Sequence, residues 1–282
     1  MKQPVSRIIT IPGIQPRGGF LPPKKLSVES LCNHPETKYE ELVVKLCRSG
    51  ALSPQTLGLV FDYLLRVEIL LSADIAVEES IQEAFYISLL GAKLADQAEN
   101  AKALVGKLIR LYKNKRRDNK KIVQTASELV RFDAMLRAGY YDPNYQPIEV
   151  TDFDKDAIKL MVDTTRIYLM QNESLTSLGF CFSGVGSENV AGSDGDLLSK
   201  ESLIDLKVSV KEPTSKHTLQ LLLYYLLGLH EQPEQYKQLR YLKIINPRLG
   251  RVYFYETAKL DTEMLRKIEH DVMGYKNSVF DL

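Results

Sequence analysis

The spacing of apolar residues along the chain changes character near residue 140. Over residues 28–139 apolar side chains recur every three or four positions, as in amphipathic helices. Ser53 followed by Pro54 predicts the start of one of these helices, because serine caps a helix N-terminus and proline fits its first turn. We therefore expect a helical region over residues 28–139.

Residues 140–282 mix helical and strand patterns, and the order of these patterns predicts an α/β fold. Residues 1–27 are rich in proline, glycine and basic residues, which predicts an extended arm rather than a packed element. The elements expected after residue 140 are a helix at 154–171, strands at 178–184, 195–199 and 202–210, an apolar helix at 215–230, strands at 239–246 and 251–257, and a last helix at 261–275.

Two charged residues stand in the clearest of these strands. Because successive side chains alternate between the faces of a strand, Asp205 and Lys207 project together, while the even positions 204–210 are all apolar. A short turn before this strand can bring Asp196 towards Asp205. An ordinary salt bridge on a surface hairpin would give the same pattern.

The alternative to a surface salt bridge is a metal site. Two close carboxylates repel one another unless a cation lies between them. Hard divalent cations such as Mg²⁺ prefer oxygen ligands and make a bound water more acidic. Lys207 beside such a site could orient the water or neutralise charge on a phosphate. Asp196, Asp205 and Lys207 therefore predict phosphodiester hydrolysis.

The apolar helix at 215–230 carries one amide, Gln220, with Tyr224 four residues later on the same face. Both side chains could point towards Asp205 and Lys207. A structural Gln–Tyr hydrogen bond in a buried core explains the pair equally well.

Residues 194–228 resemble the PD-(D/E)XK nuclease superfamily, and specifically its RecB-like branch. The order of the motifs and their strand–strand–helix context carry the resemblance. The proline that names the superfamily is replaced by glycine. The matching motifs are Gly195-Asp196, Asp205-Leu206-Lys207, and Gln220 with Tyr224.

This resemblance implies a restriction-endonuclease-like core of the form αβββαβ over residues 140–282, with a mixed central sheet flanked by helices. It also implies hydrolysis of DNA with Mg²⁺ or Mn²⁺, and it does not separate DNA from RNA. Asp196 and Asp205 would hold the metal, and Lys207 would position the attacking water. Gln220 and Tyr224 would support the substrate or the metal shell.

RecB-like members often add an acidic residue or a histidine from an upstream helix. Asp62 and Glu68 are candidates within the helical region, and Glu188 and Asp194 lie nearer in the sequence. Asp194 also suits a turn.

A basic run occupies residues 107–121, in a chain whose net charge is only +1. It predicts a clamp for a nucleic-acid backbone, although a solvated helix end would look the same. The residues expected to bind nucleic acid are Lys113, Lys115, Arg116, Arg117, Lys120 and Lys121.

The cysteine content and the lengths of the apolar runs indicate the cellular compartment. Three scattered cysteines without metal-ligand spacing fit a reducing compartment, and no apolar run is long enough to cross a bilayer. We therefore expect a cytoplasmic, metal-dependent deoxyribonuclease in phage defence, recombination or DNA processing. The alternative is a catalytically inactive nuclease fold that binds nucleic acid or a protein, with the helical region 28–139 as an insertion or as the binding part.

Overall fold

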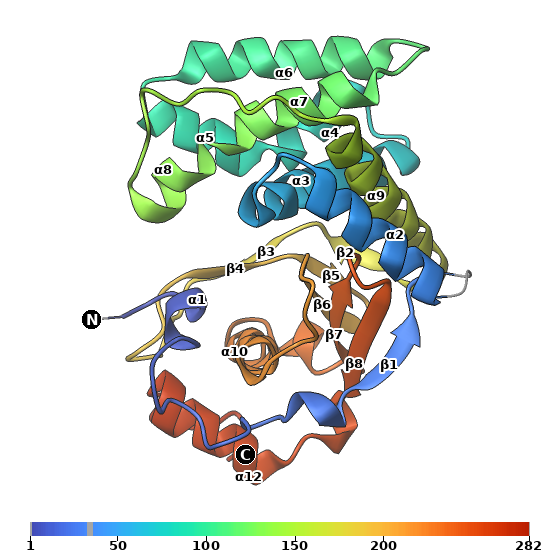
Figure 1. Ribbon diagram of the computed structural model, residues 1–282. Coiled ribbons are helices and arrows are strands. Elements are labelled where there is room, and N and C mark those ends of the chain that lie inside the picture. The colour runs from blue at the N-terminus through green and yellow to red at the C-terminus, as the bar shows by residue number, and fades with distance from the viewer. Residues whose placement is uncertain (1, 33–35, 282) are drawn as a thin grey trace.

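The computed structural model describes residues 2–32 and 36–281 and has a mixed α/β fold (Figure 1). A helical layer lies above the strands in that view. None of the helices within the described residues combines the length and apolarity needed to span a bilayer. The helices of this layer are α2 (Glu36–Ser49), α3 (Pro54–Ser72), α4 (Val77–Ala84), α5 (Tyr86–Leu94), α6 (Ala98–Lys113), α7 (Asn119–Val130), α8 (Asp133–Ala138) and α9 (Asp152–Asn172).

The central sheet has six strands in the order β1-β8-β7-β6-β5-β2. Strands β6 and β7 run parallel and the other neighbours are antiparallel, so the sheet is mixed. Helix α10 (Ser215–Glu231) is the crossover that two parallel neighbours require. The strands are β1 (Ser27–Ser30), β2 (Leu175–Ser177), β5 (Leu197–Ser199), β6 (Ser202–Leu206), β7 (Tyr241–Asn246) and β8 (Arg251–Glu256).

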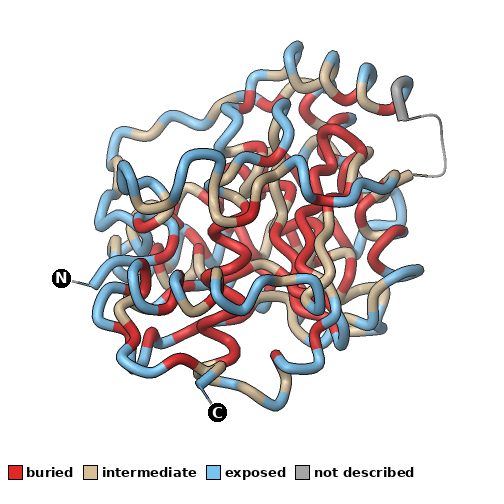
Figure 2. The backbone as a smooth tube through the Cα atoms, turned by 90° about the horizontal axis from the view of Figure 1, so that it is seen from below, coloured by how far each residue is buried: buried red, intermediate tan, exposed pale blue. Residues whose placement is uncertain are grey.

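The sheet separates two hydrophobic cores. Leu197 and Ile204 share one core with α3 and α9, whereas Leu198 and Leu203 share the other with α10. Figure 2 shows the buried residues gathered in the middle of the molecule, with exposed residues along the outer turns. The helical region and the sheet therefore meet in a common core.

The N-terminal segment differs from the free, extended arm that its composition predicts. It contains a short helix, α1 (Val5–Ile8), whose two end residues are buried in the α10 core. The amide of Val5 donates to Ser193 Oγ at 2.9 Å, and Thr218 Oγ1 donates to the carbonyl of Leu21 at 2.6 Å. The segment packs because its scattered apolar residues cover a side of α10 that would otherwise face water.

The strands predicted at 178–184, 195–199 and 202–210 are all shorter than expected, and the first covers only residues 180–182. Strand β6 ends at Leu206, and beyond it the side chain of Asn246 bonds the backbone of Ser209, with Nδ2 donating to the Ser209 carbonyl at 2.9 Å. The run 195–199 is split at Asp196, and its first part belongs to β4 (Ser193–Gly195). Strand β4 pairs with β3 (Phe180–Phe182) in a separate two-stranded ribbon.

The C-terminal elements follow the predicted order with two changes. A short helix, α11 (Pro233–Tyr236), precedes β7, and α12 (Thr262–Lys267) continues as a π-helical turn over Ile268–Met273. Gly274 ends this helix with a left-handed backbone, φ 72°.

Candidate functional site

Strands β5 and β6 bring the two predicted acids to one edge of the sheet. Leu197 pairs with Ile204, and Asp196, at the bend just before β5, lies near enough to Asp205 to raise its pKa. Asp196 Oδ2 also accepts a hydrogen bond from the amide of Leu206 at 2.6 Å, which fixes its carboxylate beside β6.

Asp205 is buried, with only 1% of its surface exposed. Its Oδ1 accepts from Lys207 Nζ at 2.8 Å, and its Oδ2 lies 2.6 Å from the same nitrogen. Oδ2 is nevertheless a buried oxygen without a hydrogen bond of favourable angle from the described residues. Burial raises the pKa of Asp205 to about 6, with Lys207 opposing the shift and Asp196 adding to it.

The neighbouring charges follow the same electrostatics. Burial raises the pKa of Asp196, and the carboxylate of Asp62 raises it further. Burial alone would lower the pKa of Lys207, but Asp205 and Asp196 outweigh it and the pKa rises. Lys207 therefore stays protonated near neutral pH beside carboxylates that gain from a further positive charge.

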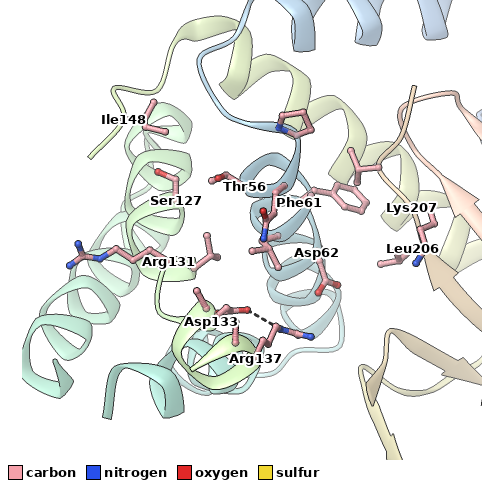
Figure 3. Close-up of a pocket in the computed structure, with 18 of the residues that line it drawn as sticks. Thr56, Phe61, Asp62, Ser127, Arg131, Asp133, Arg137, Ile148, Leu206 and Lys207 are labelled. Atoms are coloured by element: carbon pink, nitrogen blue, oxygen red, sulfur yellow. Dashed lines mark ion pairs between the residues drawn. The ribbon is translucent and has the colours of Figure 1, made fainter. Parts of the chain in front are cut away.

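Helix α3 contributes Asp62 from the opposite side of the site (Figure 3). Arg66 grips this carboxylate with two hydrogen bonds, Nε to Oδ1 and Nη2 to Oδ2, each 3.0 Å long. Arg66 Nη1 also donates to the carbonyl of Leu178 at 2.8 Å. Of the two upstream candidates in α3, Asp62 lies near enough to Asp196 to raise its pKa and shares the cleft with it. Glu68 instead pairs with Arg117 at 3.1 Å.

A cleft of about 660 Å³ lies between α3, α7, α8 and the end of β6. Asp62, Asp196 and Lys207 line it together with Arg131 and Arg137. Figure 3 shows α3 between the α7–α8 side of this cleft and Lys207. Asp62, Asp196 and Lys207 are therefore accessible from a space large enough for part of a polymeric ligand, and the buried Asp205 lies behind Lys207, which contacts it.

Gln220 and Tyr224 form the hydrogen bond that the structural interpretation of this helix predicts. Gln220 Nε2 donates to the Tyr224 hydroxyl at 2.9 Å, and that hydroxyl donates to the carbonyl of Asp194 at 2.7 Å. The ring of Tyr224 packs edge-on against Phe180. Burial raises the pKa of Tyr224, and the nearby Asp205 adds to the shift. The pair therefore lies near the acids and fixes the backbone two residues before Asp196.

The oxygen ligands at the site can be compared with those that a divalent cation requires. Within residues 2–32 and 36–281, no group of three or more histidine, cysteine or acidic side chains is arranged to hold a metal. Mg²⁺ commonly uses one or two protein carboxylates, with water and substrate phosphate completing its shell. The carboxylates of Asp196 and Asp205 supply this smaller set, although Lys207 Nζ now lies 2.6 Å from Asp205 Oδ2, so the residues fit such an ion once the lysine moves aside.

The basic run lies away from this cleft. It forms the end of α6 and the turn before α7, which Figure 1 shows at the upper right, far from β5 and β6. Lys115 and Arg116 are exposed. Three of the other predicted residues pair with acids: Lys113 with Glu78, Arg117 with Glu68 and Lys121 with Asp118. The remaining one, Lys120, borders the same turn.

Three polar residues in or beside the cleft, Arg66, Asp133 and Arg137, carry no motif that would single them out in the sequence. Arg66 is visible only as the i+4 partner of Asp62. Arg137 and the buried Asp133 pair with one another within a short helix. Their other partners are distant in the sequence, Asp194 for Arg137 and Tyr63 and Ser88 for Asp133, so packing decides their role.

Comparison with known proteins found no family model, no curated protein and no solved structure that matches the chain.

Proposed function

We propose that the protein is a metal-dependent nuclease that hydrolyses phosphodiester bonds of DNA. The observation that supports this most is the cluster of Asp196, Asp205 and Lys207: Asp196 raises the pKa of Asp205, and the ammonium of Lys207 lies 2.6 Å from Asp205 Oδ2. Asp196 and Lys207 line a cleft. We assign the αβββαβ core to α9, β2, β5, β6, α10 and β7, in chain order.

A divalent cation at Asp196 and Asp205 would neutralise phosphate charge and supply a more acidic water. Around it, each side chain has a separate task. Asp205 must lose its proton to bind the cation, which its pKa of about 6 permits at neutral pH. Lys207 stays protonated and donates a hydrogen bond towards the attacking water or the phosphate.

Other residues hold these groups in place. Arg66 fixes both oxygens of Asp62, so that this third carboxylate can orient water at the cleft side of the site. The Gln220–Tyr224 pair anchors the Asp194 carbonyl and thereby the strand that leads into Asp196. We therefore expect Gln220 and Tyr224 to act as positioning residues.

A second candidate is a non-catalytic protein on the same scaffold that binds nucleic acid. The ion pair between Lys207 and Asp205 favours it, because the lysine occupies the carboxylate that a cation would need. The two candidates differ in whether a divalent ion displaces this contact.

The test is incubation of the purified protein with linear and circular DNA and with RNA, each with Mg²⁺, Mn²⁺ or EDTA. We expect cleavage that requires a divalent ion and that Asp205→Asn abolishes. Asp163→Asn is the matched control, since Asp163 also pairs with a lysine but on the exposed face of α9. If the wild-type protein cleaved none of these substrates, the nuclease proposal would be contradicted and the non-catalytic binding protein would be favoured.

A further inference from the structure

Arg137 of α8 bridges two aspartates of very different environment. Its Nε lies 3.7 Å from Oδ2 of Asp133, whose side chain is 2% exposed. Its Nη1 lies 3.1 Å from Oδ2 of Asp194, whose side chain is 54% exposed. The arginine thus has one buried neighbour and one solvent-facing neighbour.

The buried neighbour is a fixed anchor. Asp133 Oδ2 accepts from the Tyr63 hydroxyl and Oδ1 from Ser88 Oγ, both at 2.5 Å. These bonds join α8 to α3 and α5 and leave the carboxylate little freedom. Asp133 therefore holds the guanidinium of Arg137 at the cleft wall whatever the second partner is.

The exposed neighbour is held much less firmly. An ion pair open to water contributes about 0–1 kcal/mol, so its partners exchange readily. Arginine presents a planar set of N–H donors that matches phosphate oxygens. A phosphate that reaches Arg137 can therefore replace Asp194.

Position in the cleft connects this exchange to the acids. Arg137 lines the same cleft as Asp62, Asp196 and Lys207, and Figure 3 shows its side chain reaching from α8 towards the side on which Asp62 lies. Three carboxylates at one site repel a polyanion, so a polymeric substrate needs cationic contacts elsewhere in the cleft.

We propose that Arg137 binds a backbone phosphate of the nucleic acid next to the scissile position, and that Asp194 is the placeholder that occupies it until the phosphate arrives. This rests on the proposed function for its ligand and adds a positioning residue for that ligand. It predicts opposite effects for the two partners of one ion pair. Loss of the arginine weakens nucleic-acid binding, whereas loss of the Asp194 charge strengthens it.

The experiment measures fluorescence anisotropy of labelled single-stranded and duplex DNA oligonucleotides in EDTA, so that binding is read without cleavage. Arg137→Met is expected to raise Kd about tenfold, as loss of one charge-assisted contact does. Asp194→Asn is expected to lower Kd by about threefold, and the double variant should bind like Arg137→Met. Thermal unfolding of each variant checks that the fold is retained.

Arg240→Met and Glu201→Gln are the matched controls, because this exposed pair joins an arginine to an acid at 3.1 Å on a different part of the surface. The controls should change Kd less than twofold. Equal or same-sign effects of Arg137→Met and Asp194→Asn would overturn the proposal, as would wild-type protein that binds neither oligonucleotide. Cleavage with Mg²⁺ is assayed separately, so an inactive protein whose binding responds with opposite signs would refute the nuclease and retain the role of Arg137.

Discussion

The acidic edge of the sheet and the basic turn between α6 and α7 are the two charged regions that the sequence singles out, and they differ in burial. At the sheet edge, Asp205 is 1% exposed and its pKa is raised to about 6. At the turn, Lys115 and Arg116 are exposed, and Arg117 pairs with Glu68.

Burial determines how much each region says about function. Removing a charged group from water costs several kcal/mol, so a fold without a use for Asp205 gains from an apolar residue there. Exposed charges cost little and suit any solvated helix end. The acidic edge therefore supports a functional interpretation more strongly than the basic turn does.

The largest effect should follow from Asp205→Asn in the cleavage assay. Removal of a ligand for the catalytic ion should lower the rate of DNA hydrolysis by about 10³-fold or more, because the barrier loses the ion's electrostatic contribution. Rates are measured at fixed Mg²⁺ with Asp163→Asn alongside. An Asp205→Asn variant within tenfold of the wild-type rate would contradict the assigned site.

The same substitution should stabilise the protein in the absence of metal. The pKa of Asp205 is about 6 in the fold and about 3.9 when unfolded, so between these values the native state binds more protons. The free energy of unfolding therefore falls as pH rises from about 4 to about 6, by about 2 kcal/mol. Asp205→Asn removes this loss and should be about 2 kcal/mol more stable at pH 8.

Urea unfolding in EDTA at pH 4.5 and pH 8 measures this difference. Asp163→Asn should keep the wild-type pH dependence, because its ion pair with Lys159 is exposed. If the free energy of unfolding changed by the same amount between pH 4.5 and pH 8 in the wild type and in Asp205→Asn, a raised pKa of Asp205 would be contradicted.

Tyr224→Phe should have an intermediate effect. The phenylalanine keeps the ring contacts but leaves Gln220 and the Asp194 carbonyl without a partner, at a cost of about 1–2 kcal/mol in the free energy of unfolding. Cleavage should fall by about tenfold while Mg²⁺ dependence is unchanged. Tyr225→Phe is the control, since the neighbouring tyrosine is also buried. Loss of all activity in Tyr224→Phe would instead indicate direct contact with the reacting atoms.

Charge reversal at the basic turn should have the smallest effect. Lys115→Glu combined with Arg116→Glu should weaken DNA binding by about two- to fivefold and lower the salt slope by up to about two, if each lysine or arginine neutralises one phosphate. Cleavage of a short oligonucleotide that spans only the cleft should not change. Unchanged affinity and salt slope for long DNA would remove the turn from the nucleic-acid footprint.

The sequence predicted some parts of this molecule well. Alternation predicted that Asp205 and Lys207 lie together, and Lys207, one residue beyond the end of β6, does contact Asp205. Local capping by Ser53 predicted the start of α3. The choice between Asp62 and Glu68 needed the packing of α3 against the sheet, which periodicity does not specify. The bridge from Asp133 through Arg137 to Asp194 joins segments 57 residues apart, and no local pattern encodes such a contact.

Gln220 and Tyr224 fit both hypotheses made for them, a structural hydrogen bond and a position near the acids. Gln220 and Tyr224 are four positions apart on α10, and this helical spacing brings their side chains together, as expected. Their third partner, the Asp194 carbonyl, depends on how the β3–β4 ribbon crosses α10. The packing of the N-terminal segment on α10 could not be predicted from the sequence either, because the apolar residues of this segment have no regular spacing.

Direct binding of Mn²⁺ tests the central claim that Asp196 and Asp205 together hold a divalent cation beside Lys207. Electron paramagnetic resonance of the full chain at pH 8 counts bound Mn²⁺ without any nucleic acid. We predict saturable binding to the wild-type protein and to Asp163→Asn, and at least tenfold weaker binding to Asp196→Asn and to Asp205→Asn. Equal Mn²⁺ binding by all four proteins, or none by the wild type, would contradict the account.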